Sequence, residues 1–181
     1  MCARPQRVSA DVGKRDAILE KLAAFILAEG LEAATLRAMA KAAGQSDRML
    51  LYYFADKDEI IAEAVTLLAG QLTAILAANS VPQKLRKDPL HAHLDGVVLS
   101  DEVWPYLRLW LDLAARAARE DADLSAVAQG LGQGFHQWIE SQLATTDPDL
   151  RRKEATHIMI GLEGIVVLRA VGMQDLVREL L

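Results

Sequence analysis

The sequence of 181 residues contains a single cysteine, Cys2, and its aromatic residues make up only 5% of the chain. One cysteine cannot form an intrachain disulfide, which excludes a small fold held together by disulfides. Long apolar runs are also missing. No run of about 18 residues is both uncharged and apolar throughout, and the first residues, MCARPQRVSA, lack the apolar core of a signal peptide. We therefore expect a cytoplasmic protein without a membrane-spanning segment.

Sequence motifs that carry catalysis are scarce as well. The chain has no G-x-S-x-G motif, no glycine-rich phosphate loop after a strand and no arrangement of cysteine and histidine that suggests thiol chemistry. One E-x-x-H motif, Glu154 to His157, has the spacing of a di-iron ligand pair, but that site needs a second pair, which the sequence lacks. We expect no enzymatic activity, no cofactor and no metal, with a helical-bundle metal enzyme as the alternative class.

Charge is distributed unevenly along the chain. The net charge is -5, yet residues 1–48 carry eight basic and six acidic residues, whereas the remainder carries twelve basic and nineteen acidic ones. The positive charge is therefore local. An acidic protein of this kind does not coat DNA, but it can contact DNA through a small module.

Apolar residues make up 52% of the chain and recur every three or four positions, as they do on one face of a helix. No alternating strand pattern or repeat is present, so we predict an all-α protein of eight or nine helices. Residues 1–12, with Arg4 and Arg7, are predicted to be a disordered tail or a basic arm that reaches phosphate. The helices are predicted at Lys14–Gly30, Thr35–Ala43, Asp47–Tyr53, Asp56–Ala78, Leu90–Leu99, from Ser100 or Asp101, from Asp121 or Asp123 to Leu143, Pro148–Val171 and Gln174–Leu180.

Residues 35–57 read TLRAMAKAAGQSDRMLLYYFADK and predict a helix-turn-helix, with Gly44 as the pivot between two short helices. Thr35 stands where an N-cap belongs, and Ser46 precedes the second helix. We expect Thr35, Ser46 and Lys57 to hold phosphates. Side chains that could read base edges and thymine methyl groups form the outer face of the second helix: Gln45, Asp47, Arg48, Met49 and Tyr52.

Over residues 14–65 the sequence resembles the DNA-binding domain of the TetR (tetracycline repressor) family of transcriptional regulators. The resemblance rests on Gly30, Thr35, Gly44-Gln45-Ser46, Leu50-Leu51-Tyr52-Tyr53-Phe54 and Asp56-Lys57-Asp58. It implies DNA contacts from Thr35, Arg37, Ser46, Arg48, Tyr52, Tyr53 and Lys57.

Three positions depart from the family pattern. Gln45 replaces the usual valine, Leu51 replaces a tyrosine that often touches phosphate, and Arg48-Met49 replaces a pair of small residues. The change at Leu51 removes one phosphate contact, and the bulky pair suggests an operator unlike the commonest ones.

The resemblance further implies an N-terminal three-helix domain at 14–60 and a C-terminal ligand-binding and dimerisation domain at 61–181. The expected function is a homodimeric repressor released from a palindromic operator in double-stranded DNA by a small apolar molecule. The long helix 57–78, about 33 Å at 1.5 Å per residue, is interpreted as a lever or as a plain connector.

For the C-terminal domain we predict a ligand pocket formed by aromatic residues and a methionine, and a dimer interface in the last two helices. The alternatives are a regulator controlled by a protein partner, with these aromatic residues as ordinary core, and burial of the last helices within one subunit. The predicted pocket residues are Trp104, Trp110, Phe135, Trp138 and Met159, and the predicted interface residues are Ile158, Gly161, Leu162 and Ile165.

Overall fold

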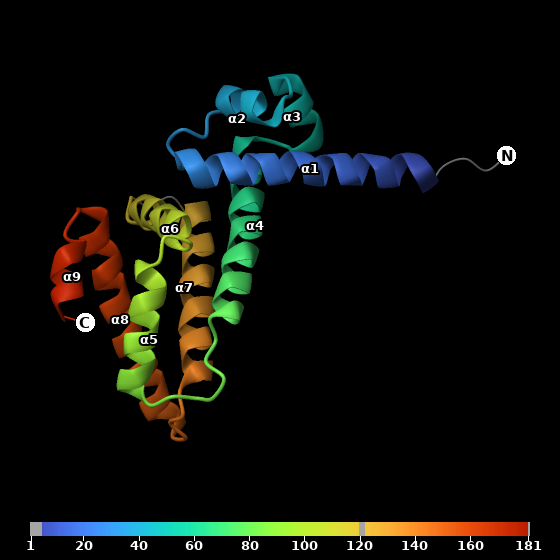
Figure 1. Ribbon diagram of the computed structural model, residues 1–181. Coiled ribbons are helices and arrows are strands. Elements are labelled where there is room, and N and C mark those ends of the chain that lie inside the picture. Colours follow the sequence, from blue (N-terminus) through green and yellow to red (C-terminus); the bar gives the residue numbers. More distant parts are fainter. Residues whose placement is uncertain (1–4, 120–121, 181) are drawn as a thin grey trace. The chain divides into compact units, whose positions relative to one another are not determined.

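The computed structural model describes residues 5–119 and 122–180, and within these ranges the regular structure is helical (Figure 1). An isolated bridge pairs Leu85 with Leu143. The all-α prediction is therefore confirmed. The helices are α1 (Pro5–Glu29), α2 (Leu36–Ala43), α3 (Asp47–Tyr53), α4 (Lys57–Ala78), α5 (Lys87–Leu99), α6 (Trp104–Ala117), α7 (Ala122–Gln142), α8 (Pro148–Ala170) and α9 (Gln174–Leu180).

Several helix boundaries differ from the prediction. Helix α1 begins at Pro5, well before Lys14, so the expected tail is helical from that residue onward. Cys2, Arg4 and Asp121 lie outside the described residues. Helix α5 begins at Lys87 and α6 at Trp104, both away from the predicted starts. Asp101 does not cap α6, because its carboxylate instead accepts a hydrogen bond from Arg169 at 2.7 Å.

The chain divides into two compact units, residues 1–71 and 72–181. The division falls inside α4, between residues 71 and 72, and the boundary expected from the sequence, between residues 60 and 61, lies nearer the start of the same helix. Residues 57–71 of this helix belong to the N-terminal unit and residues 72–78 to the C-terminal unit.

The N-terminal unit packs α1 against α2 and α2 against α3. The apolar residues at helical spacing are buried as predicted: Leu22 and Ile26 of α1 and Leu50 of α3 are fully inaccessible to solvent. Burying a side chain of this size contributes about 1.5–3 kcal/mol. This apolar packing therefore supports the short helices α2 and α3, which would be marginal in isolation.

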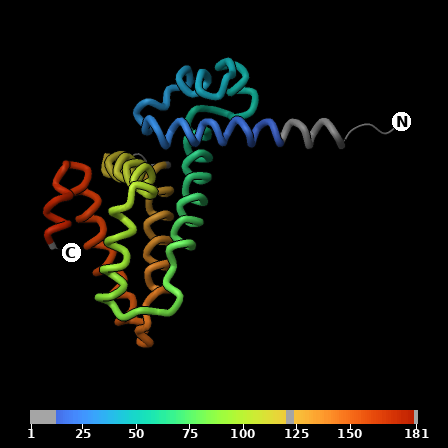
Figure 2. Tube along the Cα trace, viewed as in Figure 1, coloured from blue at the N-terminus to red at the C-terminus, as the bar shows by residue number. Residues whose placement is uncertain are grey.

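In the C-terminal unit, α8 packs against α5, α7 and α9, and α6 packs against α7. Figure 2 shows α5, α7 and α8 running side by side. Their facing sides form one apolar core, and partly buried residues such as Phe135, Trp138 and Met159 pack against it. The core residues are Leu90, Leu94, Val97, Val98, Val103, Ile139, Leu143, Ala155, Ile158 and Leu162.

Polar groups enter the packing between α5 and α8. A Cβ built at Gly161 would lie 2.5 Å from Nε2 of His91, so only glycine lets this ring approach the helix so closely. On the next turn of α5 the Asp95 side chain is 8% exposed, and its Oδ1 has no hydrogen-bond partner among the described residues. Burial raises the pKa of Asp95, and the positive form of His91, 3.5 Å away, opposes that rise.

Helix α4 is long and apolar enough to cross a membrane by length and composition, and it alone has that property among the described residues. This is weak evidence for a membrane segment, because long helices of globular proteins pass the same test. Its first half carries the buried side chains of Ile60, Ala64 and Leu68. We therefore treat α4 as a helix of the folded domains.

Candidate nucleic-acid interface

Helix α2 begins with the predicted cap. Thr35 has an extended backbone, and its Oγ1 accepts a hydrogen bond from the amide of Ala38 at 3.2 Å. One of the first-turn N–H groups that lack an intrahelical partner is thereby satisfied. Thr35 and Arg37 are both exposed, so their polar groups remain accessible to a phosphate.

The turn between α2 and α3 depends on Gly44. Its φ of 67° and ψ of 35° lie in the left-handed region, which L side chains rarely adopt. The amide of Gln45 donates to the carbonyl of Ala40 at 2.9 Å, which closes the end of α2. The chain can therefore leave α2 and start α3 within three residues, as a helix-turn-helix requires.

Helix α3 starts immediately after this turn. Oγ of Ser46 accepts from the amide of Met49 at 3.2 Å, and Asp47 places a negative charge in the first turn, where the helix dipole favours it. Leu50 is fully buried and Phe54, the C-terminal cap, is 2% exposed. These two anchors fix which side of α3 faces outward.

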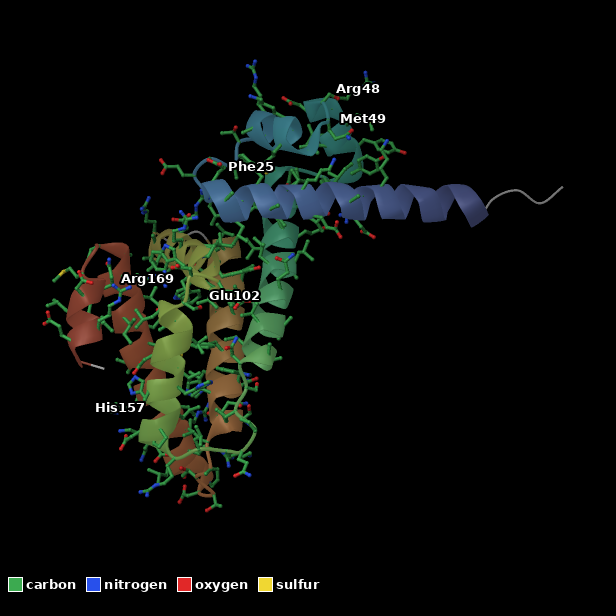
Figure 3. The ribbon with its side chains drawn as sticks, viewed as in Figure 1. Phe25, Arg48, Met49, Glu102, His157 and Arg169 are labelled. Carbon is green, nitrogen blue, oxygen red and sulfur yellow. The ribbon has the colours of Figure 1, made fainter. Side chains whose placement is uncertain are left out.

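The outward face carries the side chains predicted to read DNA. Asp47 and Arg48 are exposed, and Tyr52 is 68% exposed and lies edge-on to Tyr53, with ring centroids 5.1 Å apart. Figure 3 marks Arg48 and Met49 on the side of α3 that is away from α1. Three predicted residues are less accessible than expected, because they are only partly exposed: Gln45, Met49 and Tyr53.

Leu51 is also part of the exposed surface, at 47%. A leucine has no polar group for phosphate, so a hydrogen bond of the tyrosine type is absent there. Its apolar side chain can instead contact a thymine methyl group or sugar.

The N-terminus of α4 adds a third capped helix end. The amide of Glu59 donates to Oδ1 of Asp56 at 2.8 Å, and the carboxylate of Glu59 reaches back to the amide of Ala55. Lys57 is exposed in this first turn. A lysine there acts as a point charge for phosphate, without the fixed fork geometry of arginine.

One important residue of this unit was not predicted from the sequence. Arg15 of α1 donates to the carbonyl oxygen of Tyr53 at 3.1 Å and to Oε1 of Glu63 at 2.6 Å. Its guanidinium also lies 4.5 Å from the centroid of the Phe54 ring. The contacts span 38 and 48 residues along the chain, so no local pattern could have indicated them.

The predicted pocket residues of the C-terminal unit make several separate contacts. Phe135 and Trp138 stack with centroids 5.8 Å apart, and Trp138 donates to Oγ of Ser80 at 3.3 Å. The Trp104 ring lies 4.3 Å below the guanidinium of Arg169. A single aromatic pocket that includes Trp104 stays a prediction.

Trp110 and Met159 do lie near each other, on either side of Gly132. A Cβ built at that glycine would contact the Trp110 ring at 3.6 Å and the Met159 methyl group at 3.8 Å. The indole N–H of Trp110 donates to Oε2 of Glu163 at 2.9 Å. Burial raises the pKa of Glu163, and the hydrogen bond from Trp110 opposes the rise.

The structure corrects the predicted dimer residues. Ile158 and Leu162 are buried in the core of their own unit, Ile165 packs against that core, and Gly161 faces His91. A side chain that is buried in its own core cannot also contact a second subunit, so Ile158 and Leu162 are not available for an interface. An interface at the partly exposed Gly161 and Ile165 stays a prediction. The helical period of α8 directs a different set outward, namely Leu150, Ile160, Val167 and Val171.

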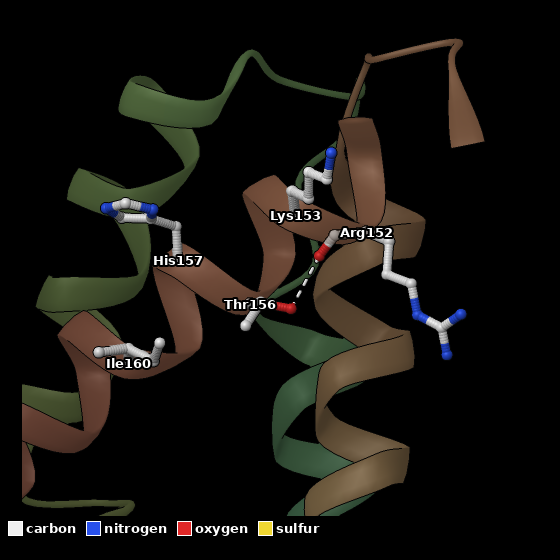
Figure 4. A pocket seen from close by; sticks show the side chains of 5 residues that line it. All are labelled: Arg152, Lys153, Thr156, His157 and Ile160. Carbon is white, nitrogen blue, oxygen red and sulfur yellow. Dashed lines mark hydrogen bonds between the residues drawn. The ribbon is translucent and has the colours of Figure 1, made fainter. Parts of the chain in front are cut away.

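The outer face of α8 also carries a shallow groove of about 480 Å³ (Figure 4). It is lined by Arg152, Lys153, Thr156, His157 and Ile160. His157 thus lies on the surface, while Glu154, its partner in the E-x-x-H motif, accepts a hydrogen bond from Thr145. Among the residues that the structure describes, no three His, Cys, Asp or Glu side chains gather where a metal could bind.

The capped helix pair, its left-handed glycine and its exposed outer face define a helix-turn-helix DNA-binding protein. Known proteins agree with this geometry. Residues 18–64 match the family described as bacterial regulatory proteins, tetR family. The HTH-type transcriptional regulator PksA of Bacillus subtilis (strain 168) is 28% identical over 156 residues, which is 82% of this chain and 76% of PksA.

Solved structures share the fold of the whole chain. A transcriptional regulator from Rhodococcus sp. Rha1 has a TM-score of 0.71 at 22% identity, covering 90% of this chain and 86% of that one. GusR of Salmonella enterica has a TM-score of 0.61 at 16% identity, covering 91% and 84%. These likenesses support a DNA-binding transcriptional regulator with the fold of TetR-family proteins. Members of this family are generally transcription factors, not enzymes.

Proposed function

We propose that this protein is a cytoplasmic homodimeric repressor that binds a palindromic operator and leaves it when a small apolar molecule binds the C-terminal unit. The observation that carries the proposal is the outward face of α3, where Arg48 and Tyr52 stand exposed beside buried anchors. An arginine there can bond the O6 and N7 atoms of guanine, and a tyrosine can contact phosphate or a thymine methyl group.

Around this face lie groups suited to the DNA backbone. Thr35, Arg37 and Lys57 are all exposed, at or near the capped N-termini of α2 and α4. Phosphate contacts fix the register of a protein on the duplex, whereas base contacts select the sequence. Base-reading and backbone-positioning groups are therefore both available in one small unit.

The surface of α8 supports dimerisation. Ile160, Val167 and Val171 are 68%, 50% and 64% exposed and follow one another at seven and four residues, the spacing of one helix face. A contiguous apolar stripe in water favours association with a like surface about a two-fold axis. A dimer would carry two α3 helices, as a palindrome requires.

Ligand control would act through the C-terminal unit. Trp110, Met159 and the partly buried Glu163 combine apolar surface with a polar group, the usual composition of a small-molecule site. Helix α4 is about 33 Å long, similar to the 34–36 Å between successive major grooves on one side of DNA. A tilt of such a helix would put the second α3 out of register.

The alternative is a regulator without a small ligand, controlled by a protein partner. It is favoured by the engagement of Trp104 with Arg169 and by the packing of Phe135 and Trp138 against the core. A thermal-shift assay with a broad panel of apolar compounds separates the two. A compound that raises the melting temperature and releases DNA supports the repressor, whereas a panel without effect favours the partner-controlled form.

The experiment that tests the proposal is selection of bound sequences from a random DNA pool by the purified protein. An enriched palindrome would establish a dimeric sequence reader and provide its operator. No enrichment at low salt, with folded and dimeric protein, would overturn it. Transcription in vitro from a promoter overlapping the selected site then tests repression, since an activator would raise the transcript level.

A further inference from the structure

Arg15 joins three parts of the N-terminal unit. From α1 its Nε donates to the carbonyl oxygen of Tyr53, the last residue of α3, and its Nη2 donates to Oε1 of Glu63 on α4. Its guanidinium lies over the ring of Phe54, and a second carboxylate, Glu59, is 3.9 Å away. The hydrogen bond to Glu63 raises the pKa of Arg15, so the side chain stays charged.

These contacts act at the C-terminal end of α3. The last carbonyl groups of a helix have no intrahelical donor, and they form the negative end of its dipole. A charged donor at the Tyr53 carbonyl satisfies one of them. The planar guanidinium can bond two acceptors in different directions and stack on a ring at the same time, which a lysine ammonium cannot do.

We propose that Arg15 is a positioning residue that holds the reading helix α3 in the orientation needed for base recognition. Helix α3 has only seven residues, and Leu50 and Phe54 anchor one side of it. Arg15 adds a directional restraint at its C-terminal turn, where Tyr52 lies. The inference rests on the proposed sequence-specific DNA binding.

Positioning should affect specific and non-specific DNA differently. A bidentate contact to a base edge requires fixed geometry, whereas attraction to phosphates depends mainly on the number of positive charges. Removing Arg15 should therefore reduce the preference for the operator more than it reduces binding to random DNA. A residue that only contributed charge would weaken both equally.

The test compares the full-length variants Arg15→Gln, Arg15→Lys and Glu63→Gln with Lys21→Gln, which removes an exposed charge from the same helix. Affinities are measured for the selected operator and for random DNA of equal length at one salt concentration. We expect Arg15→Gln to lower the ratio of the two affinities at least about tenfold, the scale of one lost base contact. For Arg15→Lys we expect an affinity ratio between those of the wild type and Arg15→Gln.

Glu63→Gln should stay close to wild type, because the amide oxygen still accepts from Arg15, and Lys21→Gln should leave the ratio unchanged. Hydrogen exchange tests folding in the same samples. In Arg15→Gln, faster exchange confined to the end of α3 supports the proposal. This region includes the amide of Phe54, which donates a hydrogen bond to the carbonyl of Leu50. Faster exchange throughout residues 14–71 would overturn it, since Arg15 would then stabilise the whole unit.

A charge exchange provides a second test. The double variant Arg15→Glu, Glu63→Arg can restore the ion pair between α1 and α4 but leaves the Tyr53 carbonyl without its donor. Recovery of stability without recovery of the affinity ratio supports positioning, and recovery of both would overturn it. If wild-type protein prefers no sequence, the proposed function itself fails. If wild-type selects an operator and Arg15→Gln keeps the same ratio, only the role of Arg15 fails.

Discussion

The two units of this protein use their polar side chains in opposite ways. In the N-terminal unit Arg48 and Tyr52 are exposed to solvent on a helix that Leu50 and Phe54 anchor in the core. In the C-terminal unit the indole of Trp110 donates a hydrogen bond to Glu163 and Trp104 lies under Arg169, while Ile160, Val167 and Val171 are exposed along α8 and its C-terminal cap. The exposed polar groups of the N-terminal unit are available to bind another molecule. The paired side chains of the C-terminal unit stabilise that unit itself, and its exposed apolar stripe is suited to contact a second copy of the chain.

The largest expected effect compares the two faces of α8. Ile158 is fully buried, so Ile158→Ala should lower the free energy of unfolding by about 2–5 kcal/mol. Ile160 is 68% exposed, so Ile160→Ala should change it by no more than about 0.5 kcal/mol in a monomer. Urea denaturation followed by circular dichroism measures both.

For dimer formation, in contrast to the stability of the monomer, we expect the exposed Ile160 to matter more than the buried Ile158. Ile160→Glu should shift the protein toward monomer in sedimentation experiments, because it places a charge in the apolar stripe. If Ile160→Glu leaves a dimer intact at low concentration, the outer face of α8 is not the interface and the comparison of the two faces fails.

In the N-terminal unit the matched pair is Arg48 and Lys57. In the proposed function Arg48 reads a base, so Arg48→Ala should weaken operator binding by about 1–3 kcal/mol and relax specificity at one base pair. Lys57 is proposed to contact phosphate, so Lys57→Ala should weaken operator and random DNA alike and reduce the salt dependence. Titrations on both DNAs at several salt concentrations decide, and equal losses for both variants would refute this division of roles.

Asp95 is the exception to the well-paired C-terminal unit, and it predicts a pH effect. Burial raises its folded-state pKa above the unfolded value, so the folded state binds the proton more readily. The stability gained from that proton is present below the unfolded pKa and is lost as pH rises through the folded pKa. Asp95→Asn should therefore stabilise the protein at pH 7 by about 1–3 kcal/mol, the cost of an unsatisfied buried group.

The advantage of Asp95→Asn should shrink as pH falls and vanish below about pH 4, where Asp95 is protonated in both states. Thermal unfolding across this range measures it, with the exposed Asp88→Asn on the same helix as control. An advantage that grows toward low pH would mean that the carboxylate is stabilised in the fold by His91 beyond the cost of burial.

The smallest expected effect concerns two glycines of α8. Alanine at Gly164 meets no atom within 4 Å and should stabilise the helix by up to about 1 kcal/mol. Gly161→Ala gains the same helix propensity, but the new methyl group must displace the His91 ring. The Gly161→Ala protein should therefore be less stable than the Gly164→Ala protein by about 1–2 kcal/mol. Equal stabilities would show that His91 moves aside without cost.

The elements that could be predicted from the sequence depend on neighbouring residues. The N-caps at Thr35, Ser46 and Asp147 bond amides three positions along, and the turn at Gly44 needs one left-handed residue. Local spacing therefore fixed α2, α3 and the starts of α4 and α8. The outward face of α3 followed from the same period once Leu50 was taken as buried.

The features that could not be predicted depend on which helix lies against which. Apolar spacing identified Ile158 and Leu162 as one face of α8, but the period alone does not say whether that face meets α5 or a second subunit. Asp101 looked like a cap because its distant partner, Arg169, is invisible in a local pattern. Arg15 was missed for the same reason.

The three tryptophans of the chain all lie in the C-terminal unit, and each has a different neighbour: a guanidinium at Trp104, a carboxylate at Trp110 and a phenyl ring at Trp138. Helices α2 and α3 contain none. Tryptophan fluorescence therefore reports on the C-terminal unit alone, without a dye or a label. A compound that enters beside Trp110 would change one emitter of three, and operator binding would alter the emission only if its effect reaches that unit.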